Sequence, residues 1–264
     1  MSFSAYCHSE RTLSASTIKT YLAGVQHFRS LQVPDRPSIF AAHPLKAVLR
    51  GIQKTQGSSR LSRQPITGQI FRDLSDILST SPFGVGPSLV LKAAIHLSFF
   101  GFLRPGEVSR ASCHAPVLLR GSLARFPEHY ELQLPNNKTR QIGQGFVVKY
   151  YRTHNSWCPV EVLDSLDRLF TSSPRDSPLL PFPTHPITSK QFIGHVRILL
   201  ANLHLDPVRF SGHSFRIGAA SAASKQGVPS YIIKHMGRWS SSCYSRYIPE
   251  PHMEVRRAFA ILLD

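Results

Sequence analysis

Acidic side chains are scarce in this sequence of 264 residues, where 15 Asp and Glu face 31 Lys and Arg and leave a formal net charge of +16. Such an excess disfavours cationic partners and favours a polyanion, nucleic acid first and an anionic membrane surface second. A merely basic protein without such a partner is the plain alternative. Charge alone does not choose between DNA and RNA.

Cysteines are also few and scattered, without a Cys-x-x-Cys pair: Cys7, Cys113, Cys158 and Cys243. Zinc sites need clustered ligands, so this spacing excludes the usual zinc folds and predicts free thiols in a reducing compartment. Long apolar runs are lacking too, because Lys92 and His96 interrupt the run over residues 89–103. Since the N-terminus has no secretory signal either, we expect neither a membrane span nor secretion.

Apolar residues at three- and four-residue steps predict helices over most of the chain. Three of these helices are clearest: one covers residues 16–31, one runs from Pro44 to about residue 52, and one runs from Thr67, a good N-cap, to about residue 78. Residues 89–102 are apolar on nearly every side, which is typical of a buried central helix. Further helices are expected from Pro159 and over residues 192–200, with at most a helical fragment over residues 3–8.

Residues 56–65 are polar and basic, without a periodic apolar face, which is typical of a linker. We therefore predict a short helical domain over residues 1–60, a linker over 61–66 and a larger domain over 67–264. In the larger domain, residues 129–134 and 146–151 are β-rich and flank a turn-rich segment, which predicts a β-hairpin. The predicted fold class is mostly α with a small antiparallel β-sheet.

Two stretches place charged side chains where the apolar pattern ends. The predicted buried helix terminates in Leu103-Arg104-Pro105-Gly106-Glu107. An unpaired buried cation is unfavourable, so Arg104 either pairs with Glu107 or faces a ligand, and both can hold. Downstream, His213 and Arg216 share one face at the start of a predicted helix, beside amide groups that can bind an anion. That arrangement predicts an oxyanion site, most simply for a phosphate.

The segment Gly212-His213-Ser214-Phe215-Arg216 begins like the nucleophile elbow of serine hydrolases. Arg216 stands where that turn requires a small residue, and no strand-like run leads into Gly212. We therefore exclude a serine hydrolase.

Several residues, taken in order, resemble the tyrosine recombinases, the lambda-integrase-like family of DNA strand-exchange enzymes: Phe102-Leu103-Arg104-Pro105-Gly106-Glu107, Lys138, His213-Ser214-Phe215-Arg216, Gly237-Arg238-Trp239 and Tyr247. The wording around residues 211–220 and 237–241 looks closest to the eukaryotic branch carried by DIRS-type and Crypton-type mobile elements. The resemblance covers residues 67–264 as a catalytic domain and residues 1–60 as a core-binding domain shorter than the family's usual helical bundle.

The resemblance implies a role for each residue. Arg104 and Arg216 would clamp the non-bridging oxygens of a DNA phosphate and need no metal. Tyr247 would form a 3′-phosphotyrosine, with His213 as acid–base helper. Lys138 would protonate the departing 5′ oxygen. Because the covalent bond stores the phosphodiester energy, neither ATP nor another cofactor is required.

Competing assignments stay open at three positions. Trp239 would either donate to the phosphate or pack in the core, and Lys149 and Arg140 compete with Lys138. Tyr244 competes with Tyr247, although the ten residues from Gly237 to Tyr247 favour the latter. Tyr21 and Tyr231 are expected to be packing residues. The basic residues expected to touch DNA are Lys19, Arg60, Arg63, Arg140 and Arg238.

The resemblance further implies duplex DNA as partner, a homo-tetramer on paired sites, no small-molecule substrate and a nuclear location. The apolar run from Met253 to Leu263 is similar to a C-terminal helix that docks into a neighbouring subunit; docking onto its own core is the alternative. Two other functions stay open. One is a catalytically inactive DNA-binding protein derived from a mobile element, and the other is a type IB topoisomerase, which relaxes DNA without a second duplex.

Overall fold

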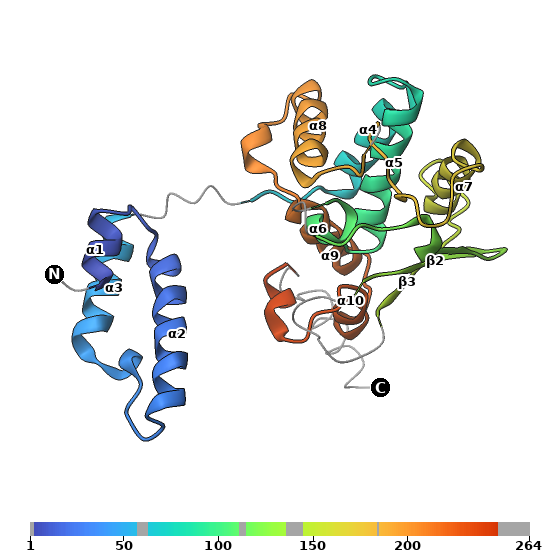
Figure 1. Cartoon of the computed structure of the whole chain (residues 1–264). Helices are drawn as coiled ribbons and strands as arrows, with labels where there is room; N and C mark the ends of the chain where they lie inside the picture. Colours follow the sequence, from blue (N-terminus) through green and yellow to red (C-terminus); the bar gives the residue numbers. More distant parts are fainter. Residues whose placement is uncertain (1–2, 57–62, 111–114, 136–144, 184, 248–264) are drawn as a thin grey trace, which may run out of the picture. The chain divides into compact units, whose positions relative to one another are not determined.

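The computed structural model describes residues 3–56, 63–110, 115–135, 145–183 and 185–247 (Figure 1). Within these ranges the chain is mostly helical with one small antiparallel sheet, which confirms the predicted fold class. The chain divides into two compact units, Met1–Leu61 and Ser62–Asp264. None of the helices in the described ranges has both the length and the apolar character of a membrane span.

The smaller unit consists of α1 (Phe3–Ser9), α2 (Ala15–Gln32), the 3-10 helix η1 (Ile39–Ala41) and α3 (His43–Thr55). Gln56 joins the ends of two helices, since its side chain accepts from the Ala15 amide at 3.0 Å and donates to the Leu13 carbonyl at 2.9 Å. Helix α1 extends the helical fragment predicted over residues 3–8 by one residue, and it packs against α2 and α3.

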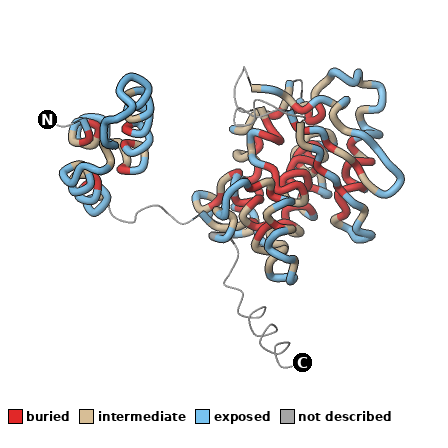
Figure 2. Tube along the Cα trace, turned by 90° about the horizontal axis from the view of Figure 1, so that it is seen from below, coloured by how far each residue is buried: buried red, intermediate tan, exposed pale blue. Residues whose placement is uncertain are grey.

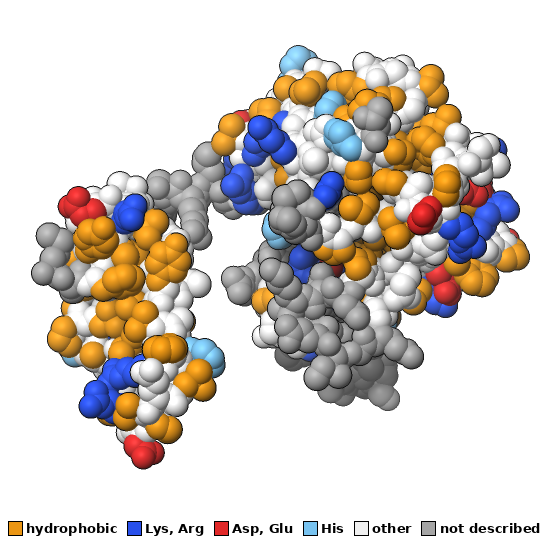
Figure 3. Space-filling model, in the orientation of Figure 1, with side chains coloured by type: hydrophobic (Ala, Val, Ile, Leu, Met, Phe, Trp, Pro, Cys, Tyr) orange, Lys and Arg blue, Asp and Glu red, His pale blue; other side chains and the backbone are white. Residues whose placement is uncertain are grey.

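Helix α2 buries less of its apolar surface than its periodicity predicted. Ile18 and Leu22 lie in the unit's small core, but the neighbouring apolar stripe stays exposed: Tyr21, Val25, Phe28 and Leu31. Figure 3 shows hydrophobic side chains gathered on the surface of this unit. A unit of this size buries a smaller fraction of its surface than a large domain does, and α1 and α3 pack against α2 without covering this stripe.

Helix α5 (Val85–Phe100) forms the centre of the larger unit, as predicted for an apolar helix. It packs against α4 (Gly68–Ser79), α7 (Pro159–Leu169) and α9 (His213–Lys225). Figure 2 shows that the buried residues of this unit lie in its interior. The other helical elements are α6 (Pro105–Val108), η2 (Arg120–Ser122), α8 (Ser189–Asn202), η3 (Pro207–Arg209), α10 (Ser230–Met236) and η4 (Ser242–Tyr247).

Part of the predicted linker belongs to the larger unit. The Gln64 amide donates to the Arg209 carbonyl at 2.8 Å, and the Ile66 amide donates to the Ser214 carbonyl at 2.9 Å. Ile66 is fully buried, and it approaches α9 at Gly218, where an added Cβ would collide with the Ile66 backbone. Residues 63–66 are therefore structured, because their backbone groups find partners on η3 and α9.

The sheet has the order β1–β2–β3 and is antiparallel throughout: β1 (Leu123–Arg125), β2 (His129–Gln133) and β3 (Val147–Tyr151). Strands β2 and β3 are the predicted hairpin, whereas β1 is too short for a periodic signal. Tyr130 and Tyr150 lie opposite each other with their side chains buried, as do Leu132 and Val148. The hairpin tip, residues 136–144, lies outside the described residues.

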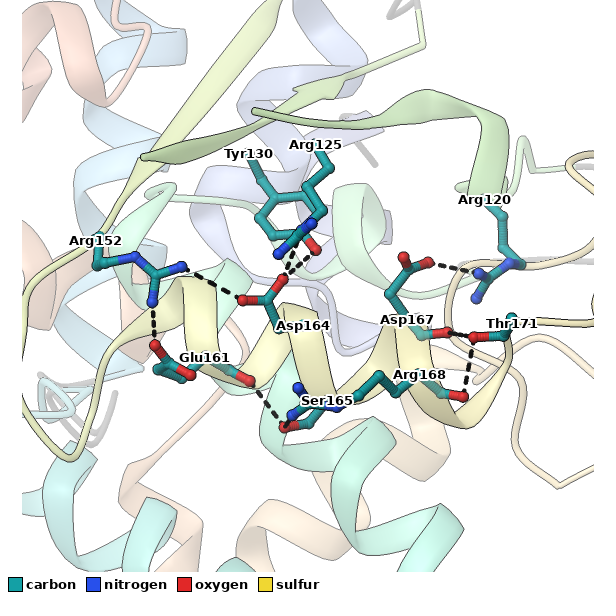
Figure 4. Close-up of polar contacts among 10 residues, drawn as sticks. All are labelled: Arg120, Arg125, Tyr130, Arg152, Glu161, Asp164, Ser165, Asp167, Arg168 and Thr171. Carbon is teal, nitrogen blue, oxygen red and sulfur yellow. Dashed lines mark hydrogen bonds and ion pairs between the residues drawn. The ribbon is translucent and has the colours of Figure 1, made fainter. Parts of the chain in front are cut away.

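The carboxylate of Asp164 fastens this sheet to α7 (Figure 4). It accepts from Tyr130 Oη and from Arg125 Nε, each at 2.8 Å, and lies 3.4 Å from Arg152 Nη2. Arg152 also pairs with Glu161. Burial alone would raise the pKa of Asp164, but the hydrogen bonds from Tyr130 and Arg125 outweigh burial and lower it. One ionised carboxylate thus connects α7 to β1, to β2 and to the residue after β3.

Candidate functional site

A tight turn after α5 positions the first arginine of the site. Gly101 ends the helix, and an added Cβ there would collide with the Tyr150 hydroxyl and the Leu97 carbonyl. Phe102 then takes a left-handed conformation with φ of 52°, which is unfavourable by about 1–2 kcal/mol for a non-glycine residue. The chain turns so sharply that Arg104 becomes the N-cap of α6, with its side chain 47% exposed.

Glu107 holds this turn together from within α6. Its Oε2 accepts from the Arg104 amide at 2.6 Å, and its Oε1 lies 3.4 Å from Arg104 Nη1. Arg104 is therefore paired with Glu107, one of the two arrangements that the sequence left open for it, and its side chain is still largely exposed to solvent.

The start of α9 forms the second part of the site. Gly212 precedes His213 and packs against Pro105, the first residue of α6, so that an added Cβ at Gly212 would collide with the proline ring. The first turns of α6 and α9 thus touch and bring Arg104 close to His213. Burial, followed by the positive charges of Arg104 and Arg216, lowers the pKa of His213.

Arg216 lies in the first turn of α9 and is buried. Its Nη1 donates to the Phe102 carbonyl at 2.8 Å, and its Nη2 donates to the Gly237 carbonyl. Its Cζ stands 4.3 Å from the centroid of the Trp239 ring, within range of a cation–π contact. The guanidinium is therefore fixed between the turn after α5 and the turn after α10.

Trp239 is buried against Phe102 and Tyr244 as well as Arg216. Core packing, one of its two alternatives, is what the structure shows. Donation from its indole to a phosphate stays a prediction.

Arg238 does not present its charge to the surface. Its Nη1 donates to the Gly101 carbonyl at 2.9 Å, its Nη2 lies 3.0 Å from Glu107 Oε2, and its side chain is 8% exposed. The guanidinium of Arg238 is thus bonded within the protein, and the predicted contact with DNA stays a prediction. The sequence carries no signal for this, since the partners are distant in the chain.

The candidate nucleophiles follow in η4, which lies against α9. Tyr244 is half-buried, with its ring centroid 5.9 Å from that of Trp239. Tyr247 is the last residue of η4, and its side chain lies outside the described part of the structure, so the choice between the two stays a prediction. Tyr21 and Tyr231, expected to be packing residues, are exposed instead.

Solved structures share this architecture. XerH site-specific recombinase bound to a palindromic difH substrate has a TM-score of 0.65 at 12% identity, over 98% of this chain and 70% of that one. Tn1549 transposon integrase in complex with circular intermediate DNA has a TM-score of 0.58 at 13% identity, over 97% of this chain and 82% of that one. A lambda integrase dimer bound to a COC′ core site has a TM-score of 0.56 at 16% identity, over 93% of this chain and 62% of that one. The chain has the tyrosine recombinase fold.

No protein-family model matches the sequence, and no curated protein matches it either. The match covers 62% of the lambda integrase chain, so this chain spans less than two thirds of that length. Similarity at this level is similarity of the tyrosine recombinase fold. It does not distinguish the eukaryotic mobile-element branch from the others.

Within the tyrosine recombinase fold, several predicted contacts lie outside the described residues: Arg60, Lys138, Arg140 and the run from Met253 to Leu263. Lys149, the competitor of Lys138, pairs with Glu131 across the hairpin at 2.8 Å. Arg63 is exposed and donates to the Val208 carbonyl at 3.0 Å, and Lys19 is exposed on α2. The latter two are placed where a polyanion can reach them.

The described site thus gathers two guanidiniums and an imidazole where α6 and α9 meet. Planar guanidiniums match the oxygens of a phosphate, and fixed cations stabilise charge that develops on it. The described residues include no group of three or more His, Cys, Asp and Glu side chains placed to share a metal ion.

Proposed function

We propose that this chain cuts and rejoins duplex DNA through a covalent bond between Tyr247 and a DNA 3′ phosphate. One observation carries the proposal: the contact between Gly212 and Pro105 brings Arg104, His213 and Arg216 together, and η4, which packs against α9, ends at Tyr247. DNA-bound integrases and recombinases of the same fold support it.

In the proposed reaction the phenol oxygen of Tyr247 attacks the phosphorus and the bond to the 5′ oxygen breaks. His213 takes the phenol proton, and Lys138 gives a proton to the departing 5′ oxygen. Arg104 and Arg216 stabilise the charge on the non-bridging oxygens, a task that some phosphoryl-transfer enzymes give to a divalent cation. The phosphotyrosine keeps the ester energy, so the reverse reaction seals DNA without ATP.

The electrostatics around His213 fit the role of a base. Because burial and the charges of Arg104 and Arg216 lower its pKa, the imidazole is neutral near pH 7 and able to accept a proton. The proposed rate should therefore fall as the pH drops below the lowered pKa of His213, where the imidazole becomes protonated.

The proposal includes the partners. Duplex DNA binds through exposed basic residues such as Lys19 and Arg63, a homo-tetramer pairs two duplexes, and the chain acts in a nucleus on mobile-element DNA. Binding should weaken steeply as salt rises, because phosphate contacts release counterions.

The test is covalent capture on DNA of unknown target sequence. Wild type, Tyr247→Phe and Tyr244→Phe are incubated with a randomised, nicked duplex library and with supercoiled plasmid, and SDS-resistant adducts are digested and sequenced by mass spectrometry. We expect a phosphotyrosine adduct at residue 247 in wild type and Tyr244→Phe, and none in Tyr247→Phe.

Other outcomes identify the alternatives. Tight DNA binding without any adduct, in wild type as in Tyr247→Phe, indicates an inactive DNA-binding protein. Plasmid relaxation by monomeric protein, without recombinant products, indicates a topoisomerase. An adduct found at residue 244 instead would identify Tyr244 as the nucleophile.

A further inference from the structure

The carboxylate of Glu107 is shared between two arginines on opposite sides. Arg104 approaches Oε1 at 3.4 Å from the exposed side, and Arg238 approaches Oε2 at 3.0 Å from the buried side. We propose that Arg238 is a positioning residue of the phosphate clamp: by neutralising Glu107 from within, it keeps Arg104 loosely held and able to turn to a phosphate. This inference rests on the proposed function, in which Arg104 binds the phosphate.

The two contacts differ in strength. The side chains of Arg238 and Glu107 are each 8% exposed, so little solvent screens their attraction. The Arg104 side chain is 47% exposed and its contact is longer, so that pair contributes little. The contact of Glu107 with Arg238 is therefore the stronger of these two ion pairs.

Arg238 is also fixed in place more firmly than Arg104. Its Nη1 donates to the Gly101 carbonyl at 2.9 Å, and its Cζ lies 5.5 Å from the ring centroid of Phe146. Its own backbone takes a left-handed conformation with φ of 54°, which aims the side chain inward. A fork of donors bonds a carbonyl and a carboxylate at once, which the single ammonium of a lysine does less well.

Removal of Arg238 has a definite consequence in this geometry. Glu107 would stay buried after losing this buried ion pair, which is strongly unfavourable. Arg104 is already within reach of the other carboxylate oxygen, so it would be drawn inward. A phosphate would then compete with Glu107 for Arg104, and the exposed half of the clamp would be weakened.

A double-mutant cycle on DNA binding tests this without requiring cleavage. The probe is a fluorescein-labelled duplex of random sequence at low salt, and the readout is the dissociation constant from anisotropy. Arg104→Ala is measured in wild type, in Arg238→Met and in Glu107→Gln/Arg238→Met, whose paired changes preserve the net charge. Thermal melting checks that each variant is folded.

We expect Arg104→Ala to weaken binding about tenfold in wild type, by less than about twofold in Arg238→Met, and again about tenfold in Glu107→Gln/Arg238→Met. A merely structural role of Arg238 would not give this pattern, since both backgrounds lose the same guanidinium. If Arg238→Met does not fold, Arg238→Lys replaces it. In that background, Arg104→Ala is expected to weaken DNA binding about threefold.

An effect of Arg104→Ala that is the same size in all backgrounds overturns the inference, and so does the absence of any effect in wild type. These results are distinct from failure of the proposed function, which is the lack of a covalent adduct in wild type. A coupled cycle in a protein that forms no adduct would leave Arg238 as a positioning residue of a DNA-binding site.

Discussion

Replacing Gly212 by alanine should move the two halves of the candidate active site apart without substituting any charged residue. Gly212 has φ of −61°, so alanine fits the backbone. The added Cβ, however, would collide with the Pro105 ring and lie 3.3 Å from Ile193 Cδ1. Since carbon atoms pack at about 3.5–4.0 Å, α9 and α6 must move apart by more than about 1 Å.

A displacement of that size has a predictable effect on the reaction. Misplacing reacting groups by about 1 Å lowers rates by about a hundredfold, whereas overpacking lowers the free energy of unfolding by only about 1–3 kcal/mol. Gly212→Ala should therefore fold and bind DNA, yet form the covalent adduct about a hundredfold more slowly in single-turnover assays.

Gly194→Ala is the matched control. Gly194 lies inside α8 with nothing within 4 Å of an added Cβ, so this variant should keep the wild-type rate and melt slightly higher. Should Gly212→Ala form adduct within about threefold of Gly194→Ala, the contact with Pro105 does not set the geometry of the site.

Three further outcomes are expected. His96 is buried in α5, and its burial lowers the pKa to about 3. The unfolded chain therefore binds the proton first, and the free energy of unfolding should fall by about 1.4 kcal/mol per pH unit as the pH drops below about 6.5. Urea titrations at several pH values should show a weaker dependence of this free energy on pH for His96→Leu. Asp164→Asn should lower the free energy of unfolding by about 1–2 kcal/mol at pH 7, and less below pH of about 4, where the lowered pKa of Asp164 means wild type is losing the same stability; Ser165→Ala on the same helix should be near neutral in the same titrations. Trp239→Ala should slow adduct formation more than it weakens DNA binding, because it removes the ring that fixes Arg216; equal losses in both assays would contradict that role.

The parts of the fold that the sequence predicted are those with a strong local period. Helices α4 and α7 repeat their apolar residues over several turns, α5 stands out instead as a long apolar run, and β2 and β3 alternate over five residues each. Strand β1 has three residues and no such signal. The burial of Ile66 and the exposure of the stripe on α2 depend on which distant elements cover them, so no local pattern predicts either.

The candidate site divides in the same way. Arg104, His213 and Arg216 stand at helix starts, where a charged residue breaks the apolar pattern, so they can be found by reading along the chain. The burial of Arg238 results from a left-handed residue and from acceptors on another turn. Periodicity contains no information on either, and the basic side chain alone favoured a contact with DNA.

Arg216 and Arg238 both donate to main-chain carbonyls, those of Gly101, Phe102 and Gly237, and Arg238 donates to the Glu107 carboxylate as well. A carbonyl is present whatever side chain its residue carries, so substitutions that keep the backbone path leave these bonds intact, whereas a Cβ added at Gly101 or Gly237 would collide with its surroundings. The anchor of these two arginines thus depends on the course of the backbone more than on the identity of the side chains around it.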